Sequence, residues 1–172
     1  MLRKQLSQVI LLSGTPGVGK TTISELLKLK GYSVLNFNDF IIQQGLYYGY
    51  DYSRESVIID EEVLKSKIET ELDRFDGLLF IEGHTSEIVP QEFVKFAFIL
   101  RCNPSVLRDR LTLTRDYSVD KIEENIQAEI MDECLIALQE QLSSTQIFEI
   151  DTTKLSPEEI VEKITDRIQI FD

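Results

Sequence analysis

Long hydrophobic segments and cysteines are scarce in this sequence, and their scarcity narrows the class of protein. No apolar run approaches the ~20 residues that a membrane-spanning helix needs, and no apolar segment near residue 1 resembles a signal peptide. The two cysteines, Cys102 and Cys134, lack the spacing of metal ligands and are expected to be reduced thiols. We therefore expect a soluble, cytoplasmic protein without membrane contact.

Positive charge is scarce in the last third of the chain. The formal net charge of the 172 residues is −12, and residues 116–172 hold 4 Lys and Arg against 15 Asp and Glu. This acidic field opposes broad binding to nucleic-acid backbones. It suits a basic protein partner, and a need for solubility explains it equally well. Repeats, linkers and low-complexity segments are absent, so we expect one domain over residues 1–172.

The most informative motif is a phosphate-binding loop that follows an apolar run and precedes a helical pattern. Its glycines let backbone N–H groups surround phosphates, and the helix N-terminus adds partial positive charge. Lys20 is expected to reach the β- and γ-phosphates, Thr21 to ligate Mg²⁺ and Thr22 to donate to the α-phosphate. The expected nucleotide-binding residues are Gly14, Pro16, Gly17, Val18, Gly19, Lys20, Thr21 and Thr22.

Strand and helix patterns alternate along the chain. Strands are predicted over residues 9–13, 32–37, 78–81, within 93–101 and over 146–150. Helices are predicted over residues 20–30, 38–44, 61–75, from Pro104, over 119–142 and from Pro157 to Ile170, with residues 45–56 irregular. Because several strands are apolar on both faces, we expect an α/β P-loop fold with a mostly parallel five-stranded sheet covered on both sides.

The motifs also limit the kind of P-loop protein. An Asn-Lys-x-Asp segment, which Ras-like GTPases need to read guanine, is absent. The chain is too short for the further signature segments of transporter ATPases. The spacing of the predicted elements fits nucleotide and small-metabolite kinases, which have an acceptor-binding insert and a closing lid. We expect the insert at about residues 38–60 and the lid at about residues 114–120.

Several segments resemble one family over nearly the whole chain. They include the loop, Gly-Leu-Tyr-Tyr-Gly-Tyr-Asp at residues 45–51, Ile-Glu-Gly-His at 81–84 and Asn-Ile-Gln-Ala-Glu-Ile at 125–130. The family is adenylate kinase isoenzyme 6 with its archaeal counterparts, the ribosome-assembly nucleotide kinases. The resemblance implies MgATP-dependent phosphorylation of AMP, a slow ATPase activity and a role in maturation of the small ribosomal subunit. It also implies a basic ribosomal protein of the pre-40S or 30S particle as partner, which agrees with the acidic residues 116–172.

Glu82 and His84, which follow the third predicted strand, are candidates for catalysis. Glu82 is expected to hold a Mg²⁺-bound water, although the family usually has aspartate here. His84 is the only histidine of the chain, and the family also has a histidine at this position. AMP needs no general base because its phosphate is already anionic, so we assign His84 to orienting water or to coupling with the partner. A structural role for His84 is the alternative.

Two arginines are expected to contact ATP. Arg115 begins the predicted lid and should close over the phosphates, offsetting charge that shifts during transfer. Arg110 should stack on the adenine base. The five-residue separation would turn Arg115 about 100° away from Arg110 on a continuous helix. We therefore expect the helix to end or loosen between them.

The acceptor side is less clearly defined by the sequence. Asp39 starts the acceptor segment and matches the family, whereas Ile42 stands where relatives often carry an arginine that holds the AMP phosphate. Arg54 is a candidate substitute for that arginine. The tyrosines of the insert, including Tyr50, could stack a base or simply pack. A shikimate- or gluconate-type metabolite kinase, and an assembly ATPase with negligible AMP kinase activity, remain alternatives.

Overall fold

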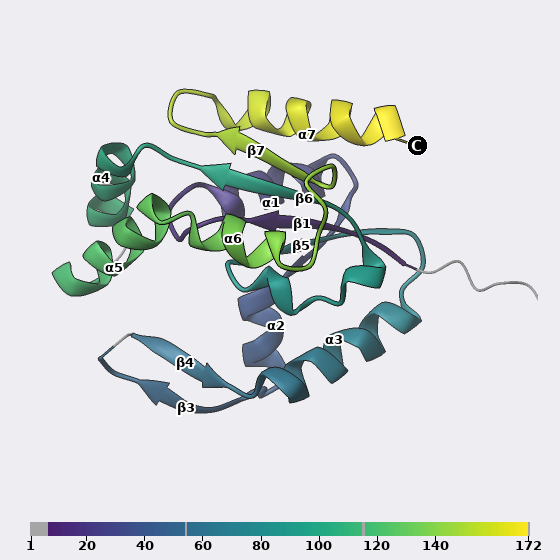
Figure 1. The fold of residues 1–172 in the computed structure, drawn as a ribbon, viewed down its shortest axis with the longest axis horizontal. Coiled ribbons are helices and arrows are strands. Elements are labelled where there is room, and N and C mark those ends of the chain that lie inside the picture. Colours follow the sequence, from purple (N-terminus) through teal and green to yellow (C-terminus); the bar gives the residue numbers. More distant parts are fainter. Residues whose placement is uncertain (1–6, 54, 115, 172) are drawn as a thin grey trace, which may run out of the picture.

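A five-stranded sheet forms the centre of the computed structural model, which describes residues 7–53, 55–114 and 116–171 (Figure 1). All neighbouring strands are parallel. The expected parallel α/β P-loop fold is therefore confirmed, and all five strands end at the same edge of the sheet. Their order across the sheet is β2 (Ser33–Asn36), β5 (Leu78–Glu82), β1 (Gln8–Ser13), β6 (Val94–Arg101) and β7 (Ile147–Asp151).

Helices cover both faces of the sheet, and alternate residues of β1 show why. Ile10 and Leu12 pack with α1 (Lys20–Leu29), α4 (Pro104–Thr114), α5 (Val119–Ile130) and α7 (Pro157–Phe171). Val9 and Leu11 point to the other face and pack with α2 (Phe37–Gln43), α3 (Glu61–Arg74) and α6 (Glu133–Gln139). Two short 3₁₀ turns, Ser86–Ile88 and Gln91–Phe93, connect β5 to β6. The period of two in each strand thus builds two apolar layers.

The local signals at two helix starts are confirmed. The Asn103 side chain accepts from the Ser105 backbone N–H at 2.9 Å, one residue after Pro104 has begun α4. Ser156 and Glu159 form the reciprocal capping box before α7, with hydrogen bonds of 2.7 and 3.2 Å. These short-range patterns need no tertiary contact, which explains why the sequence predicts them well.

The prediction that residues 45–56 are irregular is wrong for residues 47–51 and 56. They contribute β3 (Tyr47–Asp51) and the start of β4 (Ser56–Ile59), which form an antiparallel hairpin apart from the main sheet (Figure 1). Tyr50 pairs with Val57 in its register. Aromatic and β-branched residues favour such pairing, and the two glycines and five polar residues around them obscured the strand pattern.

The prediction of one long helix over residues 119–142 is also wrong. Helix α5 ends at Ile130, and α6 begins at Glu133. Between them Asp132 has a left-handed backbone with φ of 57°. Arg101 donates to the Glu129 backbone carbonyl at 3.0 Å and to the Asp132 carboxylate. Arg101 of β6 therefore binds at the point where α5 ends, and aspartate tolerates the left-handed conformation better than most residues.

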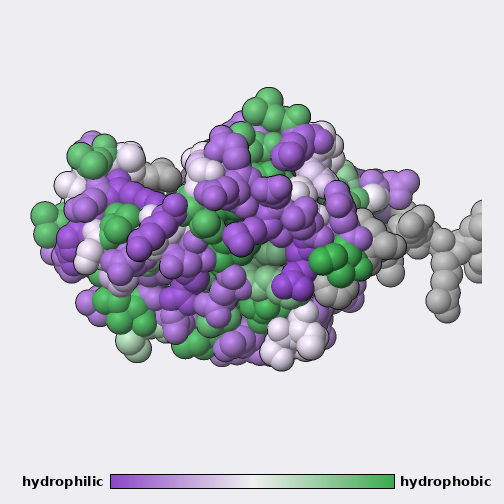
Figure 2. All heavy atoms as spheres, turned by 90° about the horizontal axis from the view of Figure 1, so that it is seen from above, coloured by the Kyte–Doolittle hydropathy of each residue, from purple (hydrophilic) through white to green (hydrophobic). Residues whose placement is uncertain are grey.

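The surface seen in Figure 2 is largely hydrophilic, with apolar side chains in separate spots. Within the part of the chain that the structure describes, no helix is long and apolar enough to cross a membrane.

Candidate active site

A cavity of about 750 Å³ opens at the edge where the parallel strands end. Its walls come from the phosphate loop, α1, α2 and α4, from the ends of β2 and β5, and from the segment after β7. Ligands of parallel α/β sheets bind at this edge. The predicted site residues that line the cavity are Pro16, Gly17, Val18, Gly19, Lys20, Thr21, Thr22, Asp39, Glu82, His84 and Arg110.

The shape of the phosphate loop depends on close packing at Gly17. This residue has φ of +90°, and a Cβ there would lie 2.8 Å from Leu111 Cδ2 and 2.9 Å from Leu107 Cδ1. A side chain would therefore be strained by the backbone and would also collide with α4. On the other side, the Thr152 hydroxyl donates to the Val18 carbonyl at 2.9 Å. The loop is thus held between α4 and the segment after β7.

Lys20 begins α1 and is buried within the loop. Its ammonium group donates to the carbonyls of Gly14 and Thr15, the latter at 3.0 Å. Thr21 and Thr22 follow it and are exposed in the cavity. An ammonium group, two hydroxyls and a helix N-terminus therefore meet in one place, which is an arrangement suited to a polyphosphate.

Glu82 is buried at the end of β5, where it is 5% exposed. The register pairs it with Asn36 of β2, and the Asn36 amide donates to the Glu82 carboxylate. Burial raises the pKa of Glu82, while the charge of Lys20 and the Asn36 hydrogen bond oppose that rise. Asn36 was not among the residues singled out from the sequence, although its place at the end of a strand was a signal.

The oxygen atoms of Glu82 and Thr21 fit Mg²⁺, because this ion prefers hard oxygen ligands. Among the described residues, no group of three or more His, Cys, Asp or Glu could hold a metal ion. Mg²⁺ in phosphate-transfer sites is usually bound by one or two protein oxygens together with substrate phosphates. Once bound, Mg²⁺ would neutralise charge on the phosphates that are transferred.

His84 lies two residues after Glu82 and is exposed in the cavity. Desolvation by the surrounding protein is the main cause that lowers the pKa of His84 from 6.5 to about 4. The positive charges of Lys20 and Lys121 lower it further. The imidazole is therefore neutral at pH 7, with one nitrogen free of a proton. A neutral imidazole at this position can accept a hydrogen bond from water.

Arg110 projects from α4 and is held by the segment after β7. It donates to the Thr152 hydroxyl at 3.2 Å and to the Thr152 carbonyl at 2.9 Å. Thr152 therefore connects Arg110 to the phosphate loop, and nothing in its sequence context indicated this. The helix continues to Thr114, and the predicted lid residue Arg115 lies outside the described residues.

On the acceptor side, Asn38 and Asp39 of α2 line the cavity, whereas the exposed Ile42 does not. Tyr50 lies on β3, with its ring 5.1 Å from that of Tyr52, and is not part of the cavity wall. Arg54 lies outside the described residues. The roles of Asp39, Tyr50 and Arg54 in acceptor binding stay predictions.

Comparison with known proteins places this geometry in a family. A family model described as an AAA domain matches residues 10–132. Proteins named "Putative adenylate kinase" from Methanocaldococcus jannaschii and Pyrococcus abyssi are 37% and 41% identical, over 93% and 91% of this chain and 85% and 81% of theirs. Shikimate kinase from Acinetobacter baumannii, in complex with shikimate, shares the fold with a TM-score of 0.63 at 17% identity, covering 98% of this chain and 96% of that one. A gluconokinase from Sinorhizobium meliloti has a TM-score of 0.54 at 15% identity, covering 92% and 89%. The chain therefore belongs to the adenylate-kinase-like family of P-loop proteins.

Proposed function

We propose that the protein is an adenylate kinase that transfers the γ-phosphoryl group of MgATP to AMP and forms two ADP. The observation that carries the proposal is the shared cavity. It joins the phosphate loop and Lys20 to Asp39 on the acceptor side and to Arg110 on α4. Donor and acceptor nucleotides could therefore lie in one space, as direct transfer requires. The relatives named as adenylate kinases support AMP as the acceptor.

The protein chain would act mainly by binding and orienting the two nucleotides. Backbone amides of the loop and Lys20 would hold the β- and γ-phosphates, and Arg110 would lie against the adenine base. Thr21 and Glu82 would hold Mg²⁺. The predicted lid, with Arg115, would close over the phosphates and exclude water.

We also propose a slow ATPase activity, which the state of His84 favours. A neutral imidazole in the cavity can orient a water molecule, whereas AMP needs no proton removed before it attacks. The described residues of α2 in the cavity, Asn38 and Asp39, offer no positive charge to an AMP phosphate. Hydrolysis would therefore compete with transfer whenever AMP is bound weakly.

The finer family assignment, adenylate kinase isoenzyme 6, remains our proposal. It rests on the segments at residues 45–51 and 125–130 and would place the protein in maturation of the small ribosomal subunit. The partner would be a basic ribosomal protein bound to the negatively charged segment of residues 116–172, which contains α5, α6, β7 and α7. Such a complex would weaken as salt is raised.

The decisive experiment compares Lys20→Met with Lys28→Met. Both lysines lie in α1, but Lys28 is exposed and pairs with Glu25, so its loss should leave activity unchanged. Products from ATP are separated by anion-exchange chromatography with AMP, with water alone, with shikimate and with gluconate. We expect ADP from AMP and ATP, and Lys20→Met should lower its rate by about 100-fold or more. ADP formation only with shikimate or gluconate would contradict the proposal and identify a metabolite kinase.

A further inference from the structure

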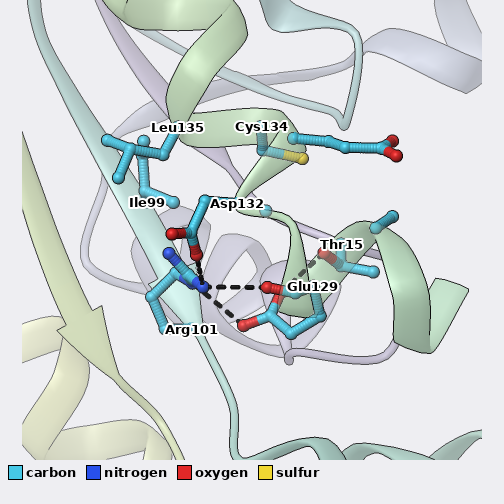
Figure 3. A pocket seen from close by; sticks show the side chains of 10 residues that line it. Thr15, Ile99, Arg101, Glu129, Asp132, Cys134 and Leu135 are labelled. Carbon is cyan, nitrogen blue, oxygen red and sulfur yellow. Dashed lines mark hydrogen bonds and ion pairs between the residues drawn. The ribbon is translucent and has the colours of Figure 1, made fainter.

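A buried carboxylate on α5 is bonded to the phosphate loop. Glu129 is 4% exposed, and its Oε2 accepts from the Thr15 hydroxyl at 2.6 Å (Figure 3). Thr15 is the second residue of the loop and is itself buried, at 2% exposed. The two residues are 114 positions apart in the sequence, so neither local pattern nor motif indicates the contact.

The other oxygen of the same carboxylate is bound to the end of β6. Glu129 Oε1 accepts from Arg101 Nε at 2.9 Å and from the Cys102 backbone N–H at 3.0 Å. With the Thr15 bond, three donors therefore hold the carboxylate in one orientation. A buried carboxylate satisfied in this way is a rigid attachment point, because breaking any of its bonds leaves charge unsolvated.

Arg101 extends this cluster to two further elements. Its guanidinium donates to the Glu129 carbonyl and to the Asp132 carboxylate at the break between α5 and α6, and to Glu149 of β7 at 3.1 Å. Burial alone would lower the pKa of Arg101, but the hydrogen bonds and charges of Glu129 and Asp132 together outweigh it and raise that pKa, so Arg101 stays positively charged. Figure 3 shows the Arg101, Asp132 and Glu129 side chains pointing toward one another.

The same part of the loop is pressed against β6. A Cβ on Gly14 would lie 2.5 Å from the Leu100 carbonyl oxygen, so the backbones of Gly14 and Leu100 are in direct contact. Thr15 follows at once, and Lys20 bonds to the carbonyls of both loop residues. A shift of Thr15 would therefore move a carbonyl that binds Lys20.

We propose that Glu129 is a positioning residue for nucleotide binding, acting through Thr15 on the phosphate loop. It fixes the position of the start of the loop and links that position to the turn between α5 and α6. The inference rests on the proposed function, since it concerns how the same site binds MgATP. It adds a residue outside the cavity wall whose hydrogen bond, rather than its bulk, sustains affinity.

The test compares variants that differ by single groups. Thr15→Val removes the hydroxyl but keeps the shape, Thr15→Ser keeps the hydroxyl, and Glu129→Gln removes the charge. Glu149→Gln removes the charge from a different partner of Arg101, and Ile68→Val removes a buried methylene of α3, in the other apolar layer. The dissociation constant for MgATP is measured by calorimetry, and folding is checked by thermal unfolding monitored by circular dichroism.

We expect Thr15→Val and Glu129→Gln each to weaken MgATP binding about tenfold, since a small displacement of a binding loop is costly. Thr15→Ser should bind like wild type, and the double variant should lose less affinity than the two single losses combined, because both changes act on the Thr15–Glu129 hydrogen bond. The inference is overturned if the MgATP affinity of Thr15→Val lies within about twofold of the two controls, Glu149→Gln and Ile68→Val. It is also overturned if Thr15→Ser binds MgATP as weakly as Thr15→Val.

Two other outcomes also have a defined meaning. If Thr15→Val does not fold, Glu129→Gln against Glu149→Gln decides, and equal affinities overturn the inference. If the wild type itself fails to bind MgATP, the proposed function falls, which is a different outcome from a wild type that binds and a Thr15→Val variant that matches it.

Discussion

Replacing Gly17 with alanine will destabilise the protein and weaken MgATP binding, because two separate penalties fall on this position. The backbone has φ of +90°, which an L side chain adopts at a cost of about 1–3 kcal/mol. The new Cβ also meets Leu111 at 2.8 Å and Leu107 at 2.9 Å, both buried on α4. Overpacking of this kind costs about 1–3 kcal/mol more.

Gly31 offers a matched control for the first penalty. Its φ is +92°, almost the same, but a Cβ there would have no atom within 4 Å. Gly31→Ala should therefore lower the free energy of unfolding by the backbone cost alone, and the difference between the two variants isolates the collision with α4. We expect that difference to be about 1–3 kcal/mol.

Urea unfolding followed by circular dichroism measures both free energies, and calorimetry measures the affinity for MgATP. Gly31→Ala should bind as wild type does, because Gly31 follows α1 at the opposite end from the loop. Gly17→Ala should bind about tenfold more weakly, since the loop or the Leu107 and Leu111 side chains must shift. Equal stability and equal affinity of the two variants would refute the packing argument.

Two further predictions concern protons in the cavity. His84 is the only histidine, so its imidazole resonances can be followed by NMR without assignment, and we expect a midpoint near pH 4 rather than 6.5. Because this pKa is lowered on folding, the stability it contributes is present above pH 6.5 and is lost as pH falls toward 4. A midpoint near 6.5 would contradict this prediction. Asn36→Ala removes a hydrogen bond that lowers the pKa of Glu82, so MgATP affinity should fall more between pH 8 and pH 6 than in wild type. Asn38→Ala, in the same cavity wall, should leave that pH dependence unchanged.

The centre of the site was accessible from the sequence because its information is local. A strand, a glycine-rich turn and a helix follow one another over residues 8–29, so the phosphate loop needs only its own neighbours to form. The same applies to Glu82 and His84, which follow a buried strand directly. Parallel strands end at one edge, and this brought both residues to the loop without knowledge of any particular contact.

Contacts between distant segments were not accessible in this way. Thr152 joins Val18 and Arg110, and Asn36 joins Glu82, in each case across a large sequence separation. The hairpin at residues 47–59 was missed because antiparallel pairing depends on the partner strand, and the strands alone carry a weak alternation. The end of α5 was also missed, because residues 119–142 carry a continuous helical pattern and the contacts at Asp132 come from Arg101, a distant residue.

The sequence alone therefore determined the α/β sheet, the phosphate loop and the edge at which the site lies, since hydrophobic periodicity and turn residues act over a few positions. Only the tertiary structure decided how that loop is held. Arg101 binds the Glu129 carbonyl and the Asp132 carboxylate where α5 ends, and the Glu129 carboxylate accepts from Thr15 of the loop. Their bonds form only once β6 and α5 are packed together, and burial then makes each of them too costly to leave unmade.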